Sequence, residues 1–196
     1  MSLAAAAIGR IEGPVDYAIP TLRAALQEGK FSRTPSWLMF FPTGQSTLGS
    51  SVGLSPAESA AWLLAETGPP AKEALPELEA VIQNGRSALR NWRDGNSSLR
   101  ILSARAIWRI SKDGTSTAPV LSESFRMNPP GQKDELTFFV ALRALEEMGP
   151  AAKSATPALV DFVNQRKNRW NDRRKVLMVL RSMDPDMADR ISLKLR

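Results

Sequence analysis

The sequence predicts an all-α fold made of repeated helix pairs, and three observations support this prediction. Apolar residues recur at spacings of three and four along most of the chain, which is the pattern of one helix face. Glycine–proline pairs, which end one helix before the next begins, recur along the chain. No segment shows the alternation of Val, Ile and Thr with polar residues that is typical of a strand.

The glycine–proline pairs belong to an internal repeat. Residues 67–78 (TGPPAKEALPEL) match residues 148–159 (MGPAAKSATPAL), and residues 12–22 show the same pattern one residue shorter. A degenerate copy starts at Asp113 and Gly114. The inner prolines stand at positions 20, 76, 119 and 157, so the intervals are 56, 43 and 38 residues. The last two intervals lie near the period of about 40 residues of two-helix repeats, and the first is longer because a segment at 31–54 breaks the repeat.

The elements can be justified in chain order. Each repeat is expected to be a pair of helices, called here the first helix and the second helix. Residues 3–12 predict a second helix whose first helix is not in the sequence. In each copy, glycine supplies the left-handed position that ends a helix, and the next helix begins around the inner proline. Residues 185–195 predict the first helix of a final, incomplete pair, with Asp184 as the N-cap and Pro185 at the first helical position.

The expected core follows from the apolar stripes. We expect Leu102, Ile107, Leu145 and Leu180 to be buried between neighbouring repeats. The stripes of the first helices are Leu78, Val81 and Ile82, and Leu159, Phe162 and Val163. The stripes of the second helices are Leu99, Leu102, Ala106, Ile107 and Ile110; Leu136, Phe139, Val140, Ala144, Leu145 and Met148; and Val176, Leu177, Val179, Leu180 and Met183.

The pattern Gly-Pro-x-Ala-Lys-x-Ala-x-Pro-x-Leu, with residues 94–100 (DGNSSLR) heading a second helix, resembles HEAT repeats of the phycobilisome-lyase type. The resemblance covers the chain outside 31–54. It implies one domain over 1–196, a right-handed α-α superhelix (an armadillo-like solenoid) of about four helix pairs plus partial terminal helices. First helices would form the convex face and second helices the concave face. In this family Asp94 and Arg100 would form a structural ladder between helices, and Arg173 holds the matching place. Because both ends are half repeats, we expect a piece of a longer solenoid.

Composition argues against most catalytic chemistry. The 196 residues include no His and no Cys, which removes Ser-His and Cys-His pairs, the commonest metal ligands and disulfides. No catalytic constellation and no glycine-rich phosphate loop is recognisable. We therefore expect no enzymatic activity, no cofactor and no metal site. No apolar run approaches the roughly 18 residues of a membrane span, and the cytoplasm is the default compartment.

Positive charge is concentrated in two blocks. The net charge of the chain is +6, and residues 86–112 and 163–196 each carry a net +6 while the rest is acidic. Both blocks combine arginines with a tryptophan at the turn between paired helices, which suits an anionic partner. A merely solvated basic edge is the alternative. The candidate partner-binding residues here are Arg86, Arg90, Trp92 and Arg93, and Arg166, Lys167, Arg169, Trp170, Arg173 and Arg174.

The segment at 31–54 is a second candidate for partner binding. It contains a short apolar run between Pro35 and Pro42, in which Trp37 and Phe40 offer apolar contacts to a partner. The alternative is that this run folds back onto the first helix pair.

Three functions follow as hypotheses. The first is a non-catalytic scaffold that binds another protein, an acidic one if the basic edge is used, through the concave face and the edge between helices. The second is a nucleic-acid binder resembling the HEAT-like alkylpurine DNA glycosylases, although the repeat here is of the other subtype. The third, suggested only by the repeat subtype, is a bilin lyase or chaperone.

Overall fold

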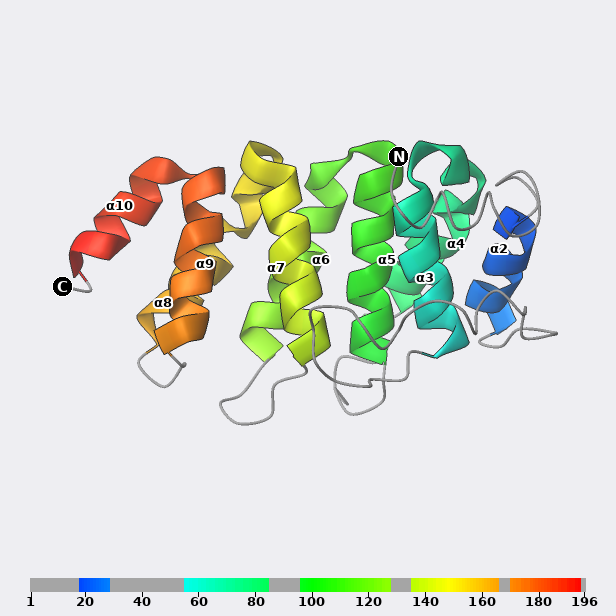
Figure 1. Cartoon of the computed structure of the whole chain (residues 1–196), viewed down its shortest axis with the longest axis horizontal. Helices are drawn as coiled ribbons and strands as arrows, with labels where there is room; N and C mark the ends of the chain where they lie inside the picture. The colour runs from blue at the N-terminus through cyan, green and yellow to red at the C-terminus, as the bar shows by residue number, and fades with distance from the viewer. Residues whose placement is uncertain (1–17, 29–54, 85–95, 128–134, 166–169, 195–196) are drawn as a thin grey trace.

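A computed structural model describes residues 18–28, 55–84, 96–127, 135–165 and 170–194, and nearly all of these residues are helical (Figure 1). No strand occurs within these ranges, so the all-α prediction is confirmed for them. The elements are α2 (Ala18–Glu28), α3 (Pro56–Thr67), the 3-10 helix η3 (Pro69–Ala74), α4 (Leu75–Asn84), α5 (Asn96–Ser111), α6 (Gly114–Met127), α7 (Glu135–Met148), the 3-10 helix η5 (Gly149–Ala155), α8 (Thr156–Asn164), α9 (Trp170–Met183) and α10 (Pro185–Lys194).

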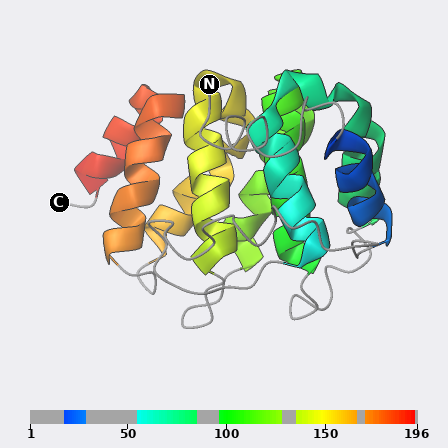
Figure 2. The ribbon, with the colours of Figure 1, turned by 45° about the vertical axis from the view of Figure 1, so that its right-hand side comes forward.

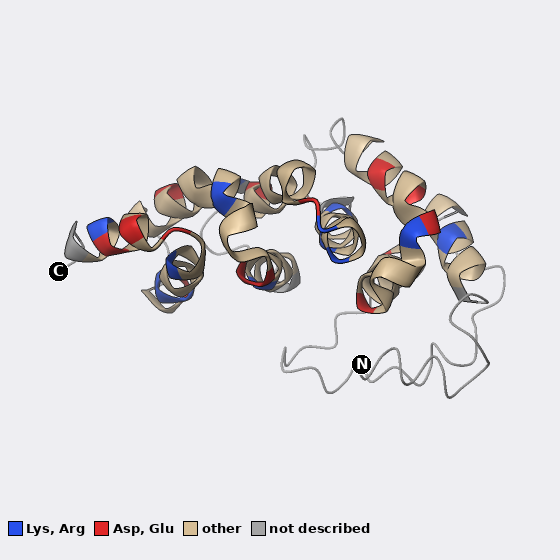
Figure 3. Ribbon diagram, turned by 90° about the horizontal axis from the view of Figure 1, so that it is seen from above, with Lys and Arg blue, Asp and Glu red and all other residues tan. Residues whose placement is uncertain are grey.

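The helices pack as successive pairs along one long axis, from α2 at one end to α10 at the other (Figure 1). The pairs are α2 with α3, α4 with α5, α6 with α7, and α8 with α9. The second helices of these pairs also contact one another in order, since α5 packs on α3, α7 on α5 and α9 on α7. The view turned by 45° shows the same succession of pairs (Figure 2). Seen from above, α3, α7 and α9 lie along one side of the molecule (Figure 3).

Two of the repeat turns have the predicted form. Gly68 and Gly149 have backbone φ angles of +71° and +55°, a region that costs most other residues steric strain. Each is followed by proline, and a 3-10 helix leads to the next α-helix: Gly68 directly precedes η3, and Gly149 is the first residue of η5. Pro76 and Pro157 then stand in the first turn of α4 and α8, where the missing N–H group costs nothing. These two glycine–proline pairs of the sequence therefore mark helix boundaries in the structure.

The turn between α5 and α6 differs from the prediction. The left-handed residue is Lys112, with φ +61°, and its N–H group donates to the carbonyl of Trp108 at 2.8 Å. Gly114 instead opens α6, at a place where a Cβ atom would lie 2.8 Å from the carbonyl oxygen of Ala151. Glycine is needed here because two backbones approach closely, and the expectation that Gly114 ends the preceding helix was wrong.

The start of α6 is held by Asp113. One oxygen of its carboxylate accepts the N–H of Thr115 at 2.8 Å, and the other accepts the hydroxyl of Ser116 at 2.9 Å. The hydrogen bond from the backbone N–H of Thr115 lowers the pKa of Asp113 most, and the one from the hydroxyl of Ser116 lowers it further. The acid acts as an N-cap, and α6 starts without a 3-10 segment such as η3 or η5.

The buried core matches most of the apolar stripes. Leu102, Ile107, Leu145 and Leu180 are all buried, as predicted. On α7 the prediction differs at one place, because Phe138 is fully buried whereas the predicted Phe139 is only partly so. The other predicted core residues in the described part of this helix are buried: Val140, Ala144, Leu145 and Met148.

Phe138 joins helices of neighbouring pairs. Its ring centroid lies 5.5 Å from those of Phe125 on α6 and Phe162 on α8. The contact with Phe125 is edge-to-face, an arrangement that adds to the gain from burial, whereas the rings of Phe138 and Phe162 are tilted by 34°.

The last helix begins as predicted. Pro185 is the first residue of α10, and the carboxylate of Asp184 accepts the N–H of Met187 at 3.2 Å. Ala188 and Ile191 are buried. The predicted helix at 3–12 and the segment at 31–54 lie outside the described residues.

Candidate interaction surface

Two arginines of the predicted ladder bind the ends of first helices. Arg100 is buried on α5, and its Nε donates to the carbonyl of Ile82 near the end of α4 at 3.1 Å. Arg173 on α9 makes the same contact with the carbonyl of Val163 near the end of α8, at 2.6 Å. Ile82 and Val163 hold the same position of the repeat, 81 residues apart, as the matching segments 67–78 and 148–159 show. These arginines satisfy carbonyls that a helix end leaves without a partner.

The acidic partner of Arg100 is Glu123 on α6, with which its guanidinium forms an ion pair. This acid was not singled out in the sequence, and Asp94, the expected partner, lies outside the described residues. Arg100 thus joins α4, α5 and α6 as part of the fold.

A buried acid, Glu77, joins the first two helix pairs. Nε and Nη2 of Arg23 on α2 donate to one oxygen of Glu77 on α4, at 2.9 and 2.6 Å. Burial alone would raise the pKa of Glu77, but the hydrogen bonds and the positive charge of Arg23 outweigh it and lower that pKa. The same contact raises the pKa of Arg23. This pair is another part of the fold whose charges are already matched.

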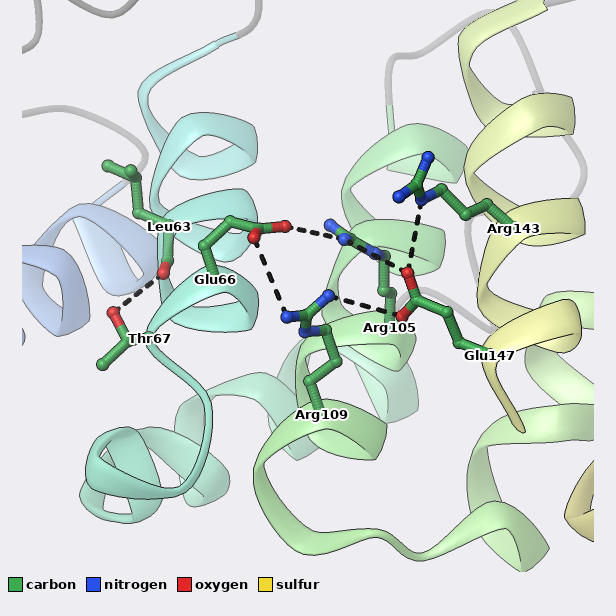
Figure 4. A network of polar contacts seen from close by, with 7 residues as sticks. All are labelled: Leu63, Glu66, Thr67, Arg105, Arg109, Arg143 and Glu147. Atoms are coloured by element: carbon green, nitrogen blue, oxygen red, sulfur yellow. Dashed lines mark hydrogen bonds and ion pairs between the residues drawn. The ribbon is translucent and has the colours of Figure 1, made fainter. Parts of the chain in front are cut away.

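The second helices α3, α5 and α7 are linked by a group of five charged residues, here called the ion-pair cluster (Figure 4). Its members are Glu66 of α3, Arg105 and Arg109 of α5, and Arg143 and Glu147 of α7. Arg105 lies 2.7 Å from Glu66 and 4.0 Å from Glu147, measured from Nη2 to the nearest carboxylate oxygen. Arg109 reaches the same two acids at 3.8 and 3.4 Å. Arg143 contacts Glu147 at 3.3 Å.

The centre of this cluster is not open to a partner. The side chain of Arg105 is only 3 % exposed, whereas that of Arg143 is 74 % exposed. The guanidinium of Arg105 also lies 4.6 Å from the ring centroid of Trp62, which adds a cation–π contact. Because three arginines here face two glutamates, the cluster carries little net charge, and it holds the second helices together.

The outer face of α9 is different. Trp170 is 58 % exposed and Met178 is 66 % exposed, and they are the only large apolar side chains that are exposed in the described part of the chain. Arg174 and Arg181 lie on the same helix face, at spacings of four, four and three along 170, 174, 178 and 181. We call these four residues the α9 stripe.

The charges around the α9 stripe are mostly unmatched. Within the described ranges, no carboxylate lies within 4 Å of Arg174 or Lys175. Lys175 places its Nζ 4.3 Å from the ring centroid of Phe139 on α7. Arg181 pairs with Asp189 on α10 at 2.9 Å, but both side chains are about two-thirds exposed, and such pairs are weak. The result is a basic surface with two apolar side chains in it.

Of the residues predicted to bind a partner, the structure describes three. Trp170, Arg173 and Arg174 lie together on the first turn and a half of α9, and the guanidinium of Arg173 lies 5.7 Å from the ring centroid of Trp170. Because Arg173 also holds Val163, it has a role in the fold. The others lie outside the described residues: Trp37, Phe40, Arg86, Arg90, Trp92, Arg93, Arg166, Lys167 and Arg169.

Met178 and Arg181 were missed in the sequence as members of this surface. Their signal was the spacing from Trp170, since positions eight and eleven residues further along lie on the same helix face.

No described helix is both long enough and apolar enough to cross a membrane. Comparison with protein families, with curated proteins and with solved structures found no match for this chain.

Proposed function

We propose that this protein is a non-catalytic scaffold of HEAT-like repeats, coiled as a right-handed superhelix, that binds an acidic partner protein. Binding would use the face of the second helices and the basic edge at α9. The observation that carries the proposal is the α9 stripe, where the exposed Trp170 and Met178 lie on one helix face with Arg174 between them.

The distribution of charge supports this proposal. On α3, α5 and α7, acids of one repeat pair with arginines of a neighbouring repeat, so these charges are matched inside the molecule. On α9, in contrast, Arg174 and Lys175 have no acidic partner in the described ranges. Exposed charges without a partner are well solvated by water in the free protein, and they attract and orient a partner of opposite charge.

A protein partner fits this surface better than nucleic acid does. Phosphates would be bound by the arginines alone, and bases would stack on Trp170. Met178 has no role in either contact, whereas exposed methionines adapt well to apolar protein surfaces. Nucleic acid remains the second hypothesis, and the experiment below separates the two.

The test is a fourfold charge reversal at Arg166, Lys167, Arg169 and Arg174 to Glu. We expect the unaltered protein to bind poly-L-glutamate, and the variant to lose this binding while its circular dichroism spectrum stays unchanged. Binding should weaken steeply with salt because charged surfaces are screened. Duplex DNA is the comparison probe.

The outcomes are distinct. Binding of the unaltered protein to DNA but not to poly-L-glutamate would favour the nucleic-acid hypothesis. Failure to bind either polyanion at low salt would mean that the basic edge is only solvated surface and would overturn the proposal.

A further inference from the structure

We infer that the α9 stripe is a docking site for an acidic amphipathic helix of the partner, with its apolar side chains between Trp170 and Met178. This inference rests on the proposed function and specifies the element that is bound.

The geometry of the stripe suits a helix. Trp170 and Met178 are eight residues apart on α9, which corresponds to about 12 Å along the helix axis. Apolar residues seven or eight positions apart on a partner helix have nearly the same spacing and lie on one face. A partner helix running along α9 can therefore place one apolar side chain against each of them.

The charges of the stripe require an acidic partner. Arg174 stands one turn from both Trp170 and Met178, so a carboxylate one turn from each apolar side chain of the partner would meet its guanidinium. Lys175, on the neighbouring position, covers the ring of Phe139 and extends the positive surface toward α7. A basic helix would be repelled by Arg174 and Lys175, which have no acidic partner in the described ranges.

The stripe is not needed to hold α9 in place. The opposite face of this helix buries Val176, Val179, Leu180 and Met183 in the core. Trp170 and Met178 are mostly in contact with solvent, so their substitution should leave the fold intact. Two large apolar side chains kept on a solvent face, where a polar residue would serve the fold equally well, indicate a contact surface.

The experiment uses two synthetic peptides of about five helical turns, ~18 residues. Both contain the same Glu, Leu and Ala residues. In one, Leu recurs every seven residues with Glu one turn away on the same face; in the other the order is shuffled, so that no face is apolar. Binding to the full chain is measured by fluorescence anisotropy at two salt concentrations.

We expect the amphipathic peptide to bind more tightly than the shuffled one. Met178→Ser should weaken this binding about tenfold, the effect of losing a central contact residue. Met178→Leu should restore it because the contact is apolar. Arg174→Glu should weaken binding at least as much, whereas Lys72→Glu, the same charge change at an exposed position of η3, should leave it unaltered.

Failure of this inference can be told apart from failure of the proposed function. Equal binding of both peptides, or binding insensitive to Met178→Ser, would overturn the docking of a helix while leaving an acidic partner in place. Loss of all binding to acidic peptides and to poly-L-glutamate would overturn both. Binding of duplex DNA that depends on Arg174 but not on Met178 would assign the surface to nucleic acid instead.

Discussion

Replacing Gly114 with Ala should destabilise the protein although α6 gains a better helix former. The added Cβ would lie 2.8 Å from the carbonyl oxygen of Ala151 and 3.2 Å from Cε of Met148, against 3.4–4 Å for ordinary contacts. The methionine can move, but the carbonyl belongs to the backbone of η5, which must shift by about 0.6 Å. Such overpacking costs about 1–3 kcal/mol, and alanine regains at most about 1 kcal/mol through helix propensity. We expect a net loss of about 1–2 kcal/mol.

Urea unfolding followed by circular dichroism measures this loss. With a slope of about 2 kcal/mol per molar urea, the midpoint should fall by about 0.5–1 M. Glu79→Ala, at an exposed position of α4, is the control and should move the midpoint little. A midpoint for Gly114→Ala equal to or above that of the unaltered protein would show that α6 and η5 do not approach closely.

Three further predictions concern stability. Lys112→Gly should raise the free energy of unfolding by about 0.5–1 kcal/mol, because Lys112 holds a φ of +61° that glycine adopts without strain; an unchanged or lower urea midpoint would contradict this. Leu145→Ala and Leu180→Ala should each cost about 2–5 kcal/mol in urea unfolding, since both side chains are fully buried, and unaltered midpoints would mean that the assigned helix faces are wrong. Asp113→Ala should cost about 1 kcal/mol at pH 7, the usual loss for an N-cap. Because the pKa of Asp113 is lowered on folding, its contribution is present above pH about 4 and is lost as the pH falls through the folded-state pKa. The difference between Asp113→Ala and the unaltered protein should therefore narrow in acid, and a constant difference would refute the role of the carboxylate.

The local backbone features of the fold were readable from the sequence. Gly68 and Gly149 were assigned their left-handed positions because glycine followed by proline restricts the chain by itself, without help from distant residues. Lys112 was not recognised, since lysine in this conformation is held by its surroundings. The role of Gly114 was missed for the same reason: its close neighbour, Ala151, is 37 residues away in the sequence.

Features that depend on how helices turn against their neighbours were less predictable. Phe138 and Phe139 are adjacent and equally apolar, so the pattern alone does not say which of them faces the core. Met178 stands among core residues in the sequence; its spacing from Trp170 places both on one helix face, but only packing shows that this face is exposed. Trp170 and Arg174 were identified as candidate partner-binding residues because a block of basic residues around a tryptophan is visible in the sequence without knowledge of the packing. The ion pair of Glu66 with Arg105 joins neighbouring repeats 39 residues apart, which no local pattern reveals.

The position of α5 has a consequence for how the protein opens. This helix packs against α3, α4, α6, α7 and η3, whereas α10 packs mainly against α9. An amide proton on α10 can exchange with solvent when a single helix detaches, but one in the middle of α5 requires several neighbours to separate at once. Of these two helices, α10 should therefore exchange its amide hydrogens faster than α5, and the rates in the middle of α5 should report the global free energy of unfolding.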